Sequence, residues 1–212
     1  MKIILDLCGG TGSWSRPYKD AGYDVRVITL PEYDVLDAGV QEMCVNLNPH
    51  GILAAPPCTM FSHARMRAKT PRDIGEGMLC VRACLDIIWR CMEVTQPTQY
   101  KKLPLQFWAL ENPYYGFLIK LLGKPAFTFD PWEFGDGYKK RTAIWGYFKE
   151  PVKGRIPISD YAMRKCRAGS FSKFDILQTK DIHPEYYETL TRAERRSITP
   201  AGFARAFFEA NP

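Results

Sequence analysis

A cysteine follows two prolines at the end of the short apolar run Gly51–Ala55, and its thiol is the first candidate for chemistry. Consecutive prolines fix two φ angles and remove two backbone donors, so the chain leaves a strand along one stiff path. Cys58, which comes next, is therefore held in place, and a cysteine thiolate is a strong nucleophile. The segment predicts a rigidly presented nucleophile at the end of a buried strand.

A carboxyl group follows the second apolar run, Leu105–Leu110. Glu111 and Asn112 come directly after that run. Burial at a strand end raises the pKa of a carboxyl group, which can then donate a proton near neutral pH. Glu111 is therefore a candidate general acid.

A glycine-rich turn, Cys8–Gly12, follows the first strand candidate, in which Asp6 is the only charged residue after Lys2. Glycines between a strand and a helix let the backbone approach a ligand closely and direct helix N–H groups toward it. The spacing differs from the dinucleotide pattern GxGxxG, so a plain structural turn is the alternative. Asp34, after the second strand candidate, could accept a hydrogen bond from an adenine amino group.

Strand-like and helix-like segments alternate through the first two thirds of the chain, which predicts an α/β fold with a doubly wound, mostly parallel sheet. In such sheets ligands bind outside the carboxyl ends of the strands. We expect strands at Lys2–Leu7, Val25–Leu30, Gly51–Ala55, Leu105–Leu110 and Arg141–Phe148. We expect helices at Ser13–Ala21, Val40–Leu47, Gly77–Val94 and Ala201–Ala210, the last one with Thr199 as N-cap.

The 212 residues, 46% hydrophobic and 25% charged, are typical of one soluble globular domain. No apolar run approaches the length of about 18 residues that a membrane span requires, and the first residues are too short for a signal peptide. We therefore expect a cytoplasmic protein without a membrane partner. Seven cysteines without paired CxxC spacing predict neither a disulfide framework nor a metal site. Cys80, Cys84 and Cys91 have the helical spacing of core residues.

The net charge of +6 is unevenly distributed. Residues 1–138 carry 14 basic and 15 acidic side chains, whereas residues 139–212 carry 15 basic and 8 acidic ones. A basic excess in one part of a chain suggests a polyanionic partner, and a merely soluble surface is the alternative.

Taken in order, these segments resemble the cytosine carbon-5 DNA methyltransferase family from residue 1 to about 148. The matching motifs are Asp6-x-x-x-Gly10-x-Gly12, Pro56-Pro57-Cys58-x-x-Phe61-Ser62 and Glu111-Asn112. The family's later QxRxR segment corresponds loosely to Lys139-Lys140-Arg141-Thr142. The chain departs from the family at Cys8, where an aromatic residue is usual, and after the second strand, where Thr29 and Leu30 replace an acidic residue.

The resemblance implies a Rossmann-like class I methyltransferase that transfers a methyl group from S-adenosylmethionine to carbon 5 of cytosine in DNA. It assigns catalytic roles to Cys58, Glu111 and Arg141. The cofactor residues that it implies are Asp6, Cys8, Gly9, Gly10, Gly12, Asp34 and Pro56. The substrate residues that it implies are Pro57, Phe61, Ser62, Arg65, Asn112 and Lys140.

It also implies three regions in a compact, phage-like member of the family. These are a catalytic domain over residues 1–150, a small basic recognition segment over 151–198, and a C-terminal helix over 199–212 that packs back on the catalytic domain. The DNA would be a duplex with a flipped cytosine or a single strand. We expect the loop Phe61–Arg72 to close over the substrate. The basic side chains of that loop that would meet phosphates are Arg65, Arg67, Lys69 and Arg72.

Three alternatives remain open from the sequence. The same chemistry could act on a free cytosine nucleotide or on RNA, because the segment available for reading bases is short. The chain could also be a non-catalytic DNA-binding relative, although it keeps both Cys58 and Glu111. A cysteine hydrolase could pair Cys58 with His63, but no third group to orient the imidazole is evident.

Overall fold

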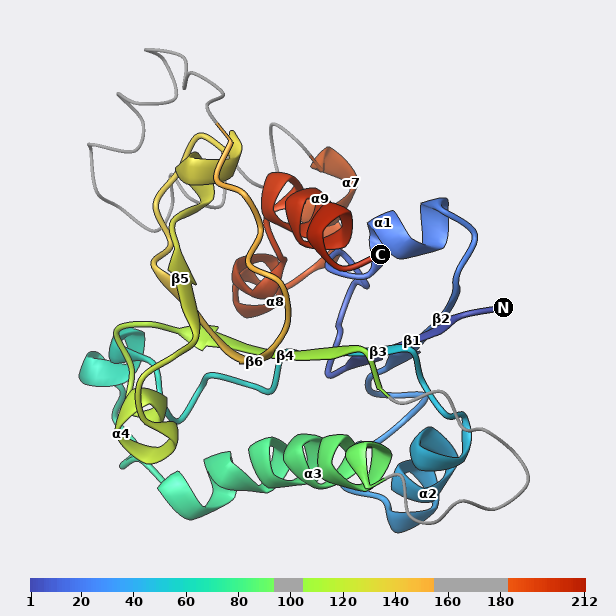
Figure 1. Cartoon of the computed structure of the whole chain (residues 1–212). Helices are drawn as coiled ribbons and strands as arrows, with labels where there is room; N and C mark the ends of the chain where they lie inside the picture. Colours follow the sequence, from blue (N-terminus) through green and yellow to red (C-terminus); the bar gives the residue numbers. More distant parts are fainter. Residues whose placement is uncertain (94–104, 155–182) are drawn as a thin grey trace.

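The computed structural model describes residues 1–93, 105–154 and 183–212. Figure 1 shows one six-stranded sheet with α2, α3 and α4 on one face and α1, α8 and α9 on the other. The strands are β1 (Ile3–Leu7), β2 (Asp24–Ile28), β3 (Gly51–Ala54), β4 (Phe107–Pro113), β5 (Phe127–Phe129) and β6 (Thr142–Tyr147). The α-helices are α1 (Arg16–Asp20), α2 (Ala38–Asn46), α3 (Ile74–Met92), α4 (Leu118–Leu122), α7 (Pro184–Thr189), α8 (Arg192–Ser197) and α9 (Ala201–Ala210). Two short 3-10 helices are η1 (His63–Arg67) and η2 (Pro131–Phe134).

The sheet is mixed, with strand order β2-β1-β3-β4-β6-β5. Strands β2, β1, β3 and β4 pair in parallel, whereas β6 is antiparallel to both β4 and β5. The α/β prediction is confirmed, and the sheet is not parallel throughout because a short connection without a crossover helix joins β5 to β6. This reversal brings the start of β6 to the carboxyl end of β4, where Thr142 pairs with Pro113.

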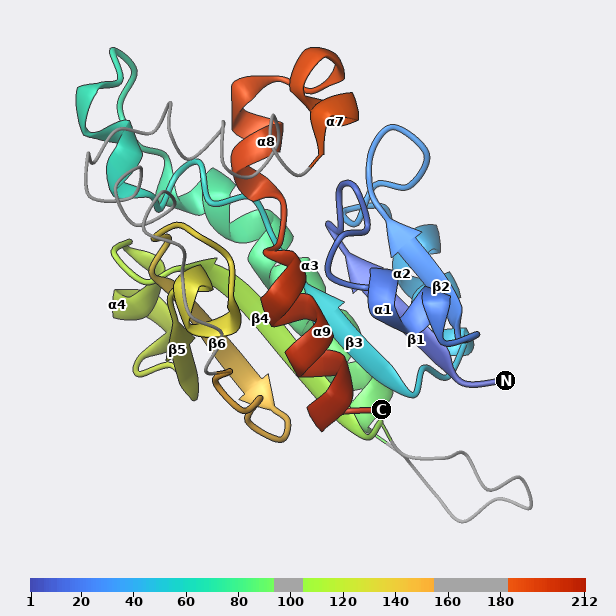
Figure 2. The same ribbon diagram turned by 90° about the horizontal axis from the view of Figure 1, so that it is seen from above.

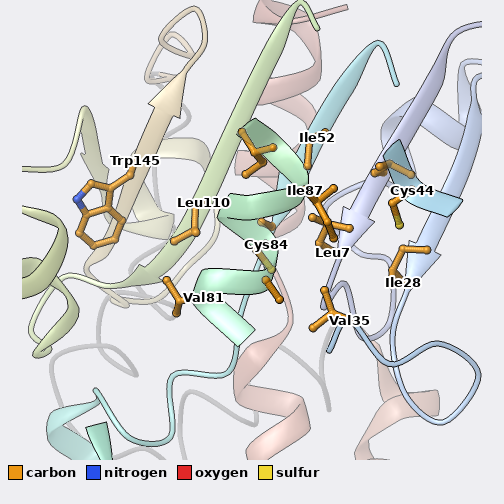
Figure 3. Packing of buried hydrophobic residues seen from close by; sticks show 14 of the residues in the cluster. Leu7, Ile28, Val35, Cys44, Ile52, Val81, Cys84, Ile87, Leu110 and Trp145 are labelled. Atoms are coloured by element: carbon orange, nitrogen blue, oxygen red, sulfur yellow. The ribbon is translucent and has the colours of Figure 1, made fainter. Parts of the chain in front are cut away.

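One layer of the core lies between the sheet and helices α2 and α3. Figure 3 shows Leu7, Ile52 and Leu110 from the strands packed against Cys84 and Ile87 of α3. The spacing of the apolar residues in α3 gives this helix one buried face. The helix begins three residues before the predicted Gly77, because the Asp73 side chain accepts a hydrogen bond from the Glu76 N–H and caps the first turn.

Aromatic side chains fill the opposite layer, between the sheet and helices α1 and α9. Phe203 of α9 stacks on Phe129 of β5 with ring centroids 3.8 Å apart, and Trp14 contacts Phe203 and Phe207. The close approach of α9 to the carbonyl group of Phe134 also requires Gly202, since an added Cβ would lie 2.1 Å from that carbonyl oxygen. Helix α9 therefore packs tightly onto the sheet.

The predicted cap of α9 differs from the structure. Pro200 occupies the N-cap position, and the backbone N–H of Thr199 donates to Ser13 Oγ at 3.0 Å. The Asp136 carboxylate caps the helix from outside by accepting a hydrogen bond from the Gly202 N–H at 3.0 Å. The Thr199 contact ties the start of α9 to the glycine turn after β1.

Two short helices, α7 and α8, precede α9 in a part of the chain where the sequence shows no strong period. Residues 155–182 of the predicted recognition segment lie outside the described residues. Among the residues that the structure does describe, no helix is long and apolar enough to cross a membrane. No group of three or more metal-binding side chains occurs in that part of the chain either.

Candidate active site

The carboxyl ends of β1, β3 and β4 lie side by side, and this arrangement builds the site. Leu7 pairs with Ala54, which in turn pairs with Leu110. The three segments that follow these residues are the glycine turn, the Pro-Pro-Cys segment and Glu111 with Asn112. Register therefore brings together the three motifs that lie far apart in the sequence. Strand β4 continues beyond β3, so that Glu111 and Asn112 pair with β6.

A tight turn and a buried amide hold the nucleophile segment. The N–H groups of Phe61 and Ser62 both donate to the Cys58 carbonyl oxygen, at 2.9 and 2.8 Å. The fully buried Asn112 donates from Nδ2 to the Pro56 carbonyl oxygen at 3.0 Å. Asn112, which the sequence predicts at the substrate, thus positions the nucleophile segment from the neighbouring strand. Its Oδ1 has no hydrogen-bond partner among the described residues.

Three ionisable groups act electrostatically on the Cys58 thiol. Burial raises the thiol pKa, and the nearby Glu111 carboxylate raises it further, while the charges of Lys140 and Arg196 lower it. The net direction is upward, so the isolated protein holds Cys58 as a thiol at neutral pH. Burial also raises the pKa of Glu111, and Lys140 partly opposes that effect. A charge on Glu111 therefore disfavours a charge on Cys58.

Lys140 is the cation at the start of β6 that acts on both catalytic candidates, whereas Arg141 faces elsewhere. The Arg141 guanidinium donates to Thr128 Oγ1 at 2.8 Å and to Asp130 Oδ2 at 3.4 Å. Neighbouring residues of an extended chain point in opposite directions, which explains the difference. The structure therefore brings Lys140, assigned by the resemblance to the substrate, beside Glu111, and directs the predicted catalytic Arg141 toward β5.

Arg196 is the group that the sequence analysis missed. It lies on α8, and Figure 2 shows this helix beyond the end of the sheet toward which the arrow of β3 points. A capping box starts the helix, with Thr191 Oγ1 accepting from the Glu194 N–H and Glu194 accepting from the Thr191 N–H. The pattern Thr-x-x-Glu is a signature of a helix start, and this signal could have revealed α8 in the sequence.

The glycine turn approaches the site with a strained backbone. Cys8, Gly10 and Gly12 have φ angles of 56°, 56° and 67°, in the left-handed region. An added Cβ at Gly10 would meet no atom within 4 Å, so the backbone is open to a ligand at this point. A Cβ at Gly9 would lie 2.4 Å from the Asp6 carboxyl carbon, so the buried carboxyl group leaves no room for a side chain at position 9.

Asp6 is fully buried beneath the glycine turn. Its Oδ2 accepts a hydrogen bond from Ser15 Oγ at 2.6 Å, and its Oδ1 has no partner among the described residues. Burial raises the pKa of Asp6 to about 6, although the Ser15 hydrogen bonds oppose this shift. The open backbone at Gly10 and this unpaired acceptor fit a ligand that carries hydrogen-bond donors, such as the amino-acid end of S-adenosylmethionine.

Three other predicted cofactor residues have contacts within the fold. Asp34 is exposed, and its Oδ1 accepts from the Leu36 N–H at 2.9 Å in a turn. The Cys8 thiol points toward α3, with its sulfur 4.0 Å from that of Cys84. The carbonyl group of Pro56 is used by Asn112, as described above. In the described structure, the contacts of these three residues are thus to other parts of the protein.

The loop after Cys58 is braced by its own arginines. Arg65 Nη2 donates to Thr70 Oγ1 at 2.6 Å and to the Pro71 carbonyl at 3.1 Å. Arg72 donates to the carbonyl oxygens of Met60 and Ser62, each at 2.8 Å. Both guanidinium groups thus shape the loop. Of the other residues predicted in this region, Pro57 and Lys69 are exposed and Phe61 is fully buried in the core. The side chain of Arg67 is not among those that the structure describes.

His63 does not supply the base that a cysteine hydrolase needs. Its ring is exposed and lies 6.4 Å from the Phe117 ring, centroid to centroid. The charged groups that act on the Cys58 thiol in the described structure are Glu111, Lys140 and Arg196. A thiol beside a carboxyl group and two cations is suited to addition chemistry on an electron-poor ring.

No protein-family model matches this chain, and a search of curated proteins gives no match. The assignment of a function therefore depends on the residues of the site and their geometry.

Proposed function

We propose that this chain is an S-adenosylmethionine-dependent cytosine carbon-5 methyltransferase that acts on DNA and has a Rossmann-like class I methyltransferase fold. The observation that carries the proposal is the electrostatic pairing of Cys58 with Glu111 at one sheet edge, beside the glycine turn. A thiol nucleophile and an acid with a raised pKa are the two groups that methylation of a cytosine ring requires.

Cytosine carbon 5 is a poor nucleophile, and the site has the groups to activate it. Transfer of the thiol proton from Cys58 to the Glu111 carboxylate leaves a thiolate and a carboxylic acid, with no change in net charge. Lys140 and Arg196 stabilise that thiolate. The thiolate adds to carbon 6 of the ring while Glu111 donates its proton to ring N3, and carbon 5 becomes the nucleophilic end of an enamine.

S-adenosylmethionine, when bound, supplies an electrophilic methyl group on its sulfonium. Gly10 would give this cofactor a close backbone approach, and Asp6 Oδ1 would accept from its amino-acid end. After carbon 5 has gained the methyl group, a base removes the carbon-5 proton. The carbon–sulfur bond to Cys58 then breaks and the N3 proton returns to Glu111, which restores the ring and the enzyme.

The test of this proposal is covalent trapping on DNA that contains 5-fluorocytosine. Fluorine at carbon 5 cannot leave as a proton, so the wild-type chain with S-adenosylmethionine should form an adduct that peptide mapping places at Cys58. The Cys58→Ser variant should form none, since a hydroxyl group is far less nucleophilic near neutral pH. Cys80→Ser, on helix α3, serves as the matched control and should be trapped like the wild type. An adduct at another cysteine would overturn the assignment.

A free cytosine nucleotide is the second candidate substrate. Arg65 and Arg72 bind carbonyl groups of their own loop, which leaves fewer cations for the phosphates of a polymer. Incubation with labelled S-adenosylmethionine and either duplex DNA, single-stranded DNA, RNA or dCMP separates the candidates. Methylation of dCMP with little on DNA would overturn the DNA substrate and leave the chemistry standing. Absence of methylation on all four would favour a non-catalytic relative.

A further inference from the structure

Two large apolar side chains are exposed near the nucleophile. Tyr115, directly after the Glu111-Asn112-Pro113 end of β4, is 63% exposed, and Met66 in η1 is 76% exposed. Exposure of this extent is ordinary for a lysine but leaves much apolar surface of a tyrosine or methionine in water. Both residues lie on segments that follow the acid and the nucleophile in the chain, so they are candidates for contact with a ligand of the site.

Backbone contacts tie both residues to the Cys58 turn. Ser62, whose N–H donates to the Cys58 carbonyl, forms a β-bridge with Gly116. The Phe117 N–H donates to the Phe61 carbonyl oxygen at 3.0 Å. An added Cβ at Gly116 would lie 3.2 Å from that same carbonyl oxygen. The segment that presents Tyr115 is thus fastened to the loop that begins at Cys58 and continues into Met66.

Cations lie on the same two segments, and two of them flank the ring of Phe117, which follows Tyr115 by two residues. Lys120 Nζ lies 5.1 Å and the Arg72 guanidinium carbon 4.8 Å from the centroid of the Phe117 ring. Lys69 is exposed in the loop that follows Met66. Exposed aromatic or apolar groups between cations are the arrangement with which proteins bind single strands, because bases stack on the former and phosphates pair with the latter.

We propose that Met66, Lys69, Tyr115 and Lys120, which we call the rim, form a docking surface for a DNA strand. The bases next to the target cytosine stack on Tyr115 and Met66, and the lysines face their phosphates. This inference rests on the proposed function and goes beyond it by requiring a polymer, since a mononucleotide has no neighbouring base. Apolar side chains inserted beside an unstacked base also stabilise an extruded nucleotide in a duplex.

The experiment measures binding of a fluorescein-labelled, mixed-sequence single-stranded DNA by anisotropy. Tyr115→Ala should bind roughly 5- to 100-fold more weakly, which is the range expected for the loss of one base–aromatic stack. Tyr115→Phe should bind like the wild type, because the ring is kept. The matched control is Tyr147→Ala, since Tyr147 is 70% exposed and pairs with Trp108 at the opposite end of the sheet. Met66→Ala should show a smaller loss than Tyr115→Ala, with Met92→Ala as its control.

Affinity for S-adenosylmethionine and the unfolding midpoint should not change in any of these variants. Equal DNA binding by Tyr115→Ala and the wild type would overturn the rim while trapping at Cys58 still supports the proposed function. A wild type that neither binds DNA nor is trapped by 5-fluorocytosine would overturn both. Tighter binding of an RNA of the same sequence, with the same loss in Tyr115→Ala, would overturn DNA as the occupant.

Discussion

At the scale of single residues, the chemistry of the site depends on one negative and two positive charges around a thiol. The Glu111 carboxylate opposes ionisation of Cys58, whereas Lys140 and Arg196 favour it. A proton on Glu111 removes the opposing charge. The same protonation that prepares Glu111 to act as an acid thus makes Cys58 easier to ionise.

Replacement of Glu111 by glutamine tests this coupling. In Glu111→Gln the opposing charge is gone, so the pKa of Cys58 should fall, and the rate of iodoacetamide alkylation at Cys58 should rise at a lower pH than in the wild type. Arg196→Gln removes a favourable charge and should shift that profile to higher pH. Turnover of Glu111→Gln should nevertheless fall by roughly two to four orders of magnitude, the usual effect of losing a positioned acid.

Glu209→Gln provides the control for both measurements, since Glu209 is exposed on α9 and pairs with Arg205. Its alkylation profile and turnover should equal those of the wild type. An unchanged Cys58 profile in Glu111→Gln would contradict the coupling, and turnover above about a tenth of wild type would contradict the role of Glu111 as the acid.

At the scale of elements, the sequence predicts most of what positions the site. The apolar runs before the glycine turn, Cys58 and Glu111 became β1, β3 and β4, and parallel register made their ends meet. The three-residue β5 escaped prediction, because Phe127–Phe129 is too short for an alternating pattern. The facing directions of Lys140 and Arg141 escaped as well, since they follow from the reversal of β6. Interactions through space, such as the electrostatic effect of Arg196 on Cys58, have no signature in local sequence.

The glycine turn allows a direct test of the cofactor position. Gly10 has a φ of 56° and open space around an added Cβ, so asparagine, which tolerates left-handed backbone better than most residues, should add little strain there. Gly10→Asn should weaken S-adenosylmethionine binding at least tenfold by calorimetry, because the side chain would occupy the ligand's space. Gly22→Asn is the matched control, with a φ of 84° and open space in the α1–β2 turn. Equal affinity in the two variants would move the cofactor elsewhere.

At the scale of the whole molecule, two buried carboxyl groups couple the fold to pH. Asp6 lies under the glycine turn, and Asp136 caps the start of α9. Burial raises the pKa of each to about 6. One carboxyl supports the turn after β1, and the other holds the C-terminal helix against the sheet. Both regions adjoin the site, so the ionisation of these two carboxyl groups affects both the stability of the fold and the geometry of the site.

The pH dependence of unfolding should report Asp6. Its pKa is higher in the folded chain than the ordinary value of 3.8, so the fold favours the protonated form. The stabilisation from that preference is complete below pH about 4 and is lost as the pH rises through about 6. At about 1.4 kcal/mol per pKa unit, the wild type should lose about 2 kcal/mol of unfolding free energy between pH 4 and pH 7, relative to Asp6→Asn. Urea unfolding at a series of pH values measures this difference, with Asp24→Asn, which removes a half-buried carboxylate paired with Arg26, as the control. If the stability curves of the wild type and Asp6→Asn run parallel over this range, Asp6 is ionised in the folded chain already at pH 4. Its unpaired oxygen then carries, without a ligand, the negative charge that we assign to binding the amino group of the cofactor.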